Sequence, residues 1–71
     1  MRYDVVFDRA PDGSWGAYPP DLPGVGVVGT THDEARILVR RAIEMHLEGL
    51  REDGLPIPDP STQDGELVEV A

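Results

Sequence analysis

Residues 31–54 have the sequence THDEARILVRRAIEMHLEGLREDG, and this stretch predicts a long helix from Thr31 to Asp53. The helix begins with a capping box, because the Thr31 hydroxyl can accept a hydrogen bond from the Glu34 amide while the Glu34 carboxylate reaches back. Gly54 suits the left-handed conformation that ends many helices. One face of the helix is mostly apolar, with residues recurring every three or four positions at Ala35, Leu38, Val39, Ala42, Ile43, His46, Leu47 and Leu50. This face has to be covered by other parts of the chain.

A β-hairpin is predicted upstream of the helix. Residues 3–8 alternate in the way that a strand with one buried face does. The buried side holds Tyr3, Val5 and Phe7. A loop over residues 9–14 follows, in which Gly13 supplies the positive φ that a tight hairpin needs. Residues 15–18 return as the second, antiparallel strand, where Gly16 is expected to mark a bulge or a close approach of another backbone.

The segments on either side of the helix are rich in proline. Residues 19–24 contain three prolines and cannot form regular structure, because proline lacks the backbone donor and restrains the residue before it. A third short strand is predicted over residues 25–28. Residues 55–60 are predicted to be extended and to lie against the domain through Leu55 and Ile57.

The end of the chain is predicted to complete the sheet. Residues 61–65 form a polar turn, and residues 66–70 form a final strand beside the first one. A right-handed crossover through the helix would make that last pairing parallel. The expected fold class is therefore α+β, in the order strand, strand, strand, helix, strand.

The charge of the chain indicates which kinds of macromolecule it can bind. Fourteen acidic residues against six basic ones give a formal net charge of −8. Such an acidic protein repels nucleic acid, since duplex binding depends on neutralising phosphates with Lys and Arg. It attracts basic proteins instead. The alternative is that the acidic surface only keeps a small domain soluble.

Three further features of the composition indicate a cytoplasmic protein. The chain has no cysteine, which excludes disulfides and thiolate metal sites and fits a reducing compartment. Its apolar runs are too short to cross a membrane, so no membrane association is expected. The N-terminal residues carry acidic side chains where a secretion signal would be apolar.

The sequence predicts no catalytic centre. Its two histidines, His32 and His46, lie three to four turns apart on the predicted helix and cannot share a site in one chain. His46 is interpreted as a core or rim residue and His32 as a surface residue. Asp4, Asp8 and Glu34 are candidates for a magnesium cluster, but Asp4 and Asp8 lie four residues apart on one strand and are therefore separated by about 13 Å. We therefore expect no enzyme activity, no metal and no cofactor.

Four motifs give the chain a family resemblance. They are Trp15-x-x-Tyr18-Pro-x-Asp21-Leu22-Pro23-Gly24, Gly29-x-Thr31-x-x-Glu34-Ala35, Ala42-Ile43-x-x-His46-Leu47 and Asp53-Gly54-x-Pro56-Ile57-Pro58-x-Pro60. Together they resemble the HicB-like antitoxin family over most of the chain, from Tyr3 to Pro60. The resemblance implies a truncated RNase H-like fold without its nuclease centre. It also implies an oligomeric protein that occludes HicA, a small basic toxin that cleaves RNA.

The chain departs from the family pattern in two places. Many members have cysteine after the Pro-Gly pair, where this chain has Val25. Antitoxins of the family commonly carry a C-terminal DNA-binding segment. Here we expect a single HicB-like domain over residues 1–71, with no C-terminal DNA-binding domain and no direct binding of nucleic acid. Two functions stay open: neutralising a HicA-like toxin, or acting as an orphan homo-oligomer in a structural or regulatory role.

Five residues are candidates for contacts with a protein partner. Trp15 and Tyr18 are spaced by three, so they face opposite sides of the sheet; one lies in the core and the other is exposed as an anchor. The spacing alone does not distinguish them. The set of candidates consists of the apolar anchors Trp15, Tyr18 and Leu22 and the charged contacts Asp12 and Asp21.

Overall fold

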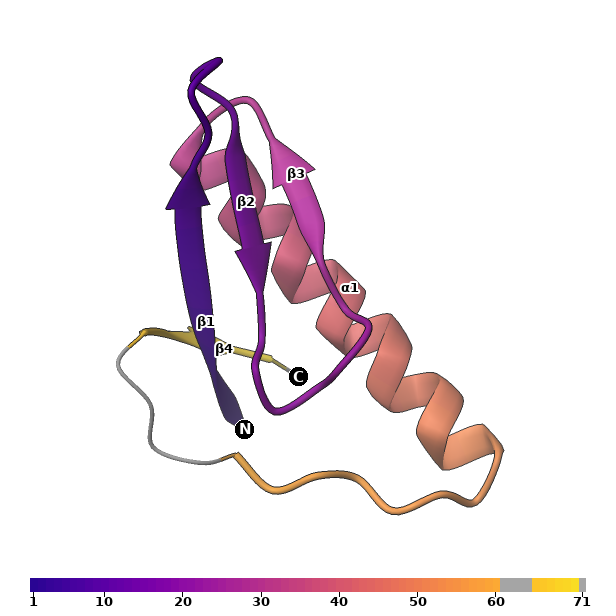
Figure 1. Ribbon diagram of the computed structural model, residues 1–71. Helices are drawn as coiled ribbons and strands as arrows, with labels where there is room; N and C mark the ends of the chain where they lie inside the picture. Colours follow the sequence, from indigo (N-terminus) through magenta and orange to yellow (C-terminus); the bar gives the residue numbers. More distant parts are fainter. Residues whose placement is uncertain (61–64, 71) are drawn as a thin grey trace.

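The computed structural model describes residues 1–60 and 65–70 as a four-stranded sheet with helix α1 packed on one face (Figure 1). The elements follow the chain as β1 (Arg2–Arg9), β2 (Trp15–Tyr18), β3 (Val27–Gly29), α1 (His32–Glu52) and β4 (Glu66–Glu69). In the sheet, the strands are ordered β3-β2-β1-β4. The predicted α+β class and the order of the elements are confirmed.

The direction of the last strand differs from the prediction. β4 pairs antiparallel with β1, in a register that places Glu66 opposite Val5 and Glu69 opposite Arg2. The crossover rule gives the handedness of a connection between two parallel strands and does not require the strands to be parallel. Here residues 55–60 are extended after α1, and β4 begins at Glu66, opposite Val5 in the middle of β1. It then runs back toward the start of β1, so the pairing is antiparallel.

The hairpin between β1 and β2 forms as expected at its loop. Gly13 has φ +89°, and Asp12 Oδ1 accepts hydrogen bonds from the Ser14 amide at 2.9 Å and the Ser14 hydroxyl at 2.6 Å. The expectation for Gly16 is wrong. The strands pair one to one through this position, with Gly16 opposite Asp8, so there is no bulge. A Cβ atom added to Gly16 would lie 3.9 Å from its nearest neighbours, an ordinary contact distance.

The third strand begins two residues later than predicted, at Val27. The chain is still turning before that point: the Val25 amide donates to the Leu22 carbonyl at 3.2 Å, and Gly24 has φ +89°. Gly29 then ends β3 where the first turn of α1 lies directly against it. A Cβ atom at Gly29 would lie 2.7 Å from the Ala35 amide nitrogen, so only glycine fits this crossing.

The helix is capped at both ends, largely as predicted. Thr31 Oγ1 accepts from the Glu34 amide at 3.0 Å, but the Glu34 carboxylate accepts from the amide of Thr30 at 2.8 Å rather than from that of Thr31. At the other end, Gly54 has φ +68° and its amide donates to the Arg51 carbonyl at 3.1 Å. Fully buried side chains recur every four residues along α1, at Ala35, Val39, Ile43 and Leu47.

The core lies between this stripe of α1 and one face of the sheet. The sheet contributes Tyr3, Val5, Ala17 and Val68, and the loop after β2 adds Leu22. Partly buried side chains surround this centre, among them Phe7, Trp15, Val25, Val27, Leu50 and Ile57. The opposite face of the sheet carries no helix (Figure 1), and we call it the open face.

A hydrogen bond from the core holds the extended segment after α1. The hydroxyl of Tyr3, which is fully buried, donates to the carbonyl of Pro58 at 2.6 Å. Ile57 packs against the core as predicted, whereas Leu55 is 52% exposed and does not. Most of the predicted turn over residues 61–65 lies outside the described residues.

The two ends of the described chain meet at one corner of the sheet. The Val70 amide donates to the Met1 carbonyl at 2.8 Å, and the Met1 amino group lies 3.4 Å from the Val70 carbonyl. Arg2 and Glu69 form an ion pair at 3.1 Å across the same pair of strands. The termini marked in Figure 1 lie near one another for this reason.

Candidate functional site

The candidate catalytic residues do not converge. Across residues 1–60 and 65–70, no group of three or more His, Asp or Glu side chains is arranged to hold a metal ion. Asp4 is nearly fully buried, and its Oδ2 accepts from the Gly65 amide at 3.1 Å. Its Oδ1 has no hydrogen-bond partner within the described part of the chain. The carboxylate ties β1 to the start of β4, while Asp8 is exposed farther along β1.

His32 lies at the surface as expected, with 32% of its side chain exposed, but it also makes contacts that the sequence did not predict. Its ring centroid lies 4.3 Å from that of Phe7 and 5.2 Å from that of Trp15, the latter in an edge-on arrangement. Its Nε2 lies 3.1 Å from Oε2 of Glu66. Sequence reasoning missed this role because the ring's partners lie far along the chain.

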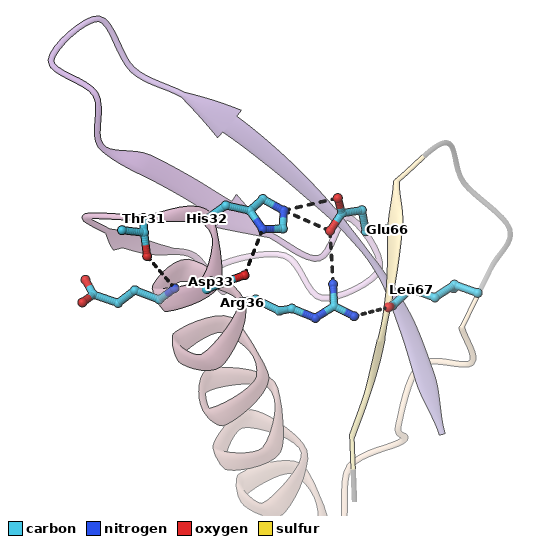
Figure 2. Close-up of polar contacts among 7 residues, drawn as sticks. Thr31, His32, Asp33, Arg36, Glu66 and Leu67 are labelled. Carbon is cyan, nitrogen blue, oxygen red and sulfur yellow. Dashed lines mark hydrogen bonds and ion pairs between the residues drawn. The ribbon is translucent and has the colours of Figure 1, made fainter.

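Arg36 reaches the same carboxylate one helical turn later. Its Nη1 donates to Glu66 Oε2 at 3.1 Å, and its Nη2 donates to the Leu67 carbonyl at 3.0 Å. Figure 2 shows His32 and Arg36 converging from α1 on the first residues of β4. We call His32, Arg36 and Glu66 the clasp. It has no nucleophile, and its geometry fixes the last strand to the helix.

The structure separates the five predicted contact residues. Trp15 lies on the helix side, partly buried against the core, and Tyr18 lies on the open face with 44% of its surface exposed. Tyr18 is therefore the accessible aromatic residue of the pair. Leu22 is only 1% exposed, so it packs in the core and a partner cannot reach it in the folded domain.

The two candidate acidic residues lie at opposite ends of β2. Asp12 is in the hairpin loop before the strand, and Asp21 is in the proline-rich loop after it. Hydrogen bonds from the Ser14 hydroxyl and amide hold the pKa of Asp12 below its ordinary value. The five residues do not form one continuous patch, and a contact surface has to be assigned from exposure instead.

The open face carries the largest exposed apolar side chains of the sheet. Tyr18 pairs with the half-buried Val6, while Val28 on β3 is 70% exposed and Leu67 on β4 is 55% exposed. These four residues come from all four strands. The sequence offered a signal for them, since a strand with one face in water normally alternates apolar with polar residues. Val28 and Leu67 break that alternation on the solvent side.

A shallow hollow lies on the open face between Tyr18 and Val28. Its volume is about 380 Å³. Two glycines, Gly16 and Gly26, and the acidic residue Asp8 are among the residues that line it. This hollow combines an aromatic ring, apolar surface and a negative charge, which suits contact with a protein better than a chemical reaction.

Comparison with known proteins agrees with this geometry. Residues 3–69 match the family described as the HicB-like antitoxin of bacterial toxin–antitoxin systems. The chain belongs to the HicB-like antitoxin family. The resemblance predicted from the sequence motifs is confirmed.

Individual relatives of this HicB-like chain support the assignment. It is 36% identical over 70 residues to Antitoxin HicB 2 of Photorhabdus laumondii, covering 99% of this chain and 50% of that protein. It is 31% identical over 64 residues to the UPF0150 protein Ta0767 of Thermoplasma acidophilum, covering 90% of this chain and 93% of that protein. The HicB-like chain thus spans half the length of one curated relative and nearly all of another.

Solved structures show the same fold. The N-terminal domain of antitoxin HicB from Burkholderia pseudomallei superposes with a TM-score of 0.88 at 28% identity, over 100% of this chain and 99% of that one. A chain of the HicA3 and HicB3 toxin–antitoxin complex matches with a TM-score of 0.71 at 27% identity, over 89% of this chain and 72% of that one. Among the described residues, α1 is the one helix, and it lacks the long apolar run that a membrane span needs.

Proposed function

We propose that this HicB-like domain is the toxin-binding part of an antitoxin. In this role it binds a small, basic, RNA-cleaving toxin of the HicA type in the cytoplasm and occludes the active site of that toxin. The observation that carries the proposal is the family match over residues 3–69. The structural similarity to a chain from a HicA3 and HicB3 complex supports it.

The physical character of the chain is consistent with such a partner. The net charge of −8 draws a basic protein toward the domain and repels the RNA or DNA that a nuclease would need to bind. The open face presents Tyr18, Val28 and Leu67 as apolar contacts. In this proposal the domain acts by covering the toxin, and it has no enzyme activity, metal or cofactor of its own.

The alternative is an orphan homo-oligomer without a toxin partner. One observation favours it: the open face and the two edge strands β3 and β4 are surfaces on which a second copy could pack. Oligomerisation is also compatible with toxin binding. The solution mass of the chain alone, with and without toxin, separates a purely self-associating domain from an antitoxin.

The deciding experiment is co-expression with the small basic protein encoded beside this chain. Growth arrest caused by the toxin should be relieved, and the two proteins should co-purify as a complex. If no such neighbour exists, or if the pair neither co-purifies nor restores growth, the orphan oligomer becomes the better description.

A further inference from the structure

Two glycines of the open face have no structural reason to be glycine. Neither Gly16 nor Gly26 has a positive φ, in contrast to Gly13, Gly24 and Gly54. A Cβ atom at either position would meet its nearest neighbours at 3.9 Å or more, which is ordinary contact. A larger residue would fit the backbone at both positions.

Glycine at these positions carries a cost to the fold. At Gly16, which lies in β2, a side chain, above all a β-branched one, would stabilise the strand. At both positions glycine loses more conformational freedom on folding than any other residue would. Both destabilising glycines lie on the same side of the sheet, the open face. Their shared consequence is the hollow between Tyr18 and Val28, which side chains at Gly16 and Gly26 would fill.

Around the hollow, each glycine lies next to a residue with a large side chain. Gly16 pairs with Val28 on β3, and Gly26 lies beside Tyr18, since a Cβ at Gly26 would be 4.0 Å from the Tyr18 Cβ. Asp8 pairs with Gly16 from the other side, on β1. The hollow therefore has an aromatic wall, an apolar wall and a carboxylate along one margin.

The negative charge of Asp8 indicates which kind of side chain the hollow would bind. Asp8 is exposed and has no ion-pair partner among the described residues. A carboxylate beside an aromatic ring favours a cationic side chain, whose stem can lie on apolar surface while its charge meets the acid and the ring face. A second copy of this chain would bring another Asp8 and another net charge of −8 to the same surface, which is unfavourable.

We propose that this hollow is a socket for a Lys or Arg side chain of a basic protein partner, and that Gly16 and Gly26 keep it open. The proposal rests on the proposed function, because the partner is the HicA-type toxin. It adds the surface that contacts the toxin and names Asp8, Tyr18 and the two glycines as the residues that determine affinity.

The test fills the socket without damaging the fold. Gly16→Val places a β-branched side chain in the hollow, so the melting temperature should stay the same or rise while the affinity for an inactive variant of the toxin falls at least tenfold. Gly49→Ala is the matched control, because it also replaces a glycine whose position can accept a Cβ atom, but it lies on α1. It should bind the toxin as the wild type does.

A second variant keeps the test decisive if Gly16→Val fails to fold. Asp8→Asn changes only an exposed charge, and it should weaken toxin binding and reduce the dependence of the association rate on salt. A folded Gly16→Val or Asp8→Asn protein that binds with wild-type affinity would overturn the socket while leaving the proposed function intact. If wild type itself fails to bind the toxin, the proposed function fails instead. Loss of self-association in Gly16→Val without toxin would assign the face to a second copy and also overturn the socket.

Discussion

At the scale of single residues, Gly29 is held closely against the backbone of α1. A Cβ atom there would lie 2.7 Å from the Ala35 nitrogen and 3.1 Å from its Cα, both backbone atoms that cannot move aside alone. Gly29→Ala should therefore separate β3 from the first turn of α1 and lower the free energy of unfolding by about 1–3 kcal/mol. Urea denaturation followed by circular dichroism measures the change.

For Gly49→Ala we expect the opposite change, an increase in the free energy of unfolding. Gly49 lies within α1 with nothing within 4 Å of its Cβ position, so alanine should stabilise the helix by about 0.5–1 kcal/mol. If Gly29→Ala proves as stable as wild type while Gly49→Ala behaves as expected, the close crossing of β3 and α1 is wrong.

Sequence reasoning was accurate for residues whose role is local. The Thr31 cap and the positive φ of Gly13 and Gly54 follow from interactions within a few residues, and the structure confirms them. Leu22 and His32 could not be placed, because their surroundings come from segments distant in the chain. The choice between Trp15 and Tyr18 likewise depends on which face α1 covers, and spacing along one strand cannot decide it.

At the scale of elements, the extended segment after α1 depends on Tyr3. Burial raises the pKa of the Tyr3 phenol above its ordinary value of 10.0, with further contributions in the same direction from Asp21 and Asp59 and an opposing one from Arg51. The folded state therefore binds the proton more tightly than the unfolded state. This contribution to stability is complete below pH 10.0 and is lost as the pH rises through the raised value.

Tyr3→Phe tests this attachment. The variant loses the hydrogen bond to the Pro58 carbonyl, so its free energy of unfolding at neutral pH should fall by about 0.5–1.5 kcal/mol. Its stability should also decline less steeply than that of wild type above pH 10.0, because the titrating group is gone. Equal slopes for the two proteins, measured by urea denaturation across the alkaline range, would contradict the assignment.

The clasp predicts the local stability of β4. Glu66→Gln weakens the contacts from His32 and Arg36, so amide hydrogen exchange in β4 should become several-fold faster. The global free energy of unfolding should change by less than about 1 kcal/mol, since these groups are largely exposed. Glu44→Gln is the control: it removes one charge from the exposed Arg40 pair on α1 and should leave β4 exchange unchanged.

The direction of β4 is a feature that the sequence pattern could not predict. Residues 66–70 were expected as a strand beside β1 and were found there as Glu66–Glu69. Their direction depends on contacts with distant parts of the chain, which local pattern does not encode. The clasp and the hydrogen bond from Gly65 to Asp4 fix the position of β4, and both join residues at least 30 positions apart.

At the scale of the whole molecule, the net charge is expected to control how stability and partner binding respond to salt. A net charge of −8 on so small a domain creates repulsion in the compact state that salt can screen. Thermal stability should therefore rise between about 10 mM and about 0.3 M NaCl. Glu48→Gln, which removes one exposed negative charge from α1, should show a smaller rise. A fall in melting temperature with salt would show that attractive ion pairs outweigh the repulsion.

The same charge should govern the encounter with a basic toxin. The association rate constant should decrease several-fold as salt rises over that range, whereas the dissociation rate constant should change little. Stopped-flow or surface-based kinetics with the inactive toxin separates the two rates. A dissociation rate that carries most of the salt effect would indicate that short-range ion pairs, rather than the overall field, control the affinity.

The meeting of the chain ends at one corner has a mechanical consequence. Arg2 opens β1 and Glu69 closes β4 in the same rung of the ladder, next to the bond between Val70 and Met1. Hydrogen bonds of an antiparallel pair lie across the strands, so a force that pulls the two ends apart loads them one after another, as in unzipping. The domain should yield to such a pull at low force. Because Val68 is a core residue, removal of β4 would break the clasp to α1 and open the core while the hairpin between β1 and β2 is still formed.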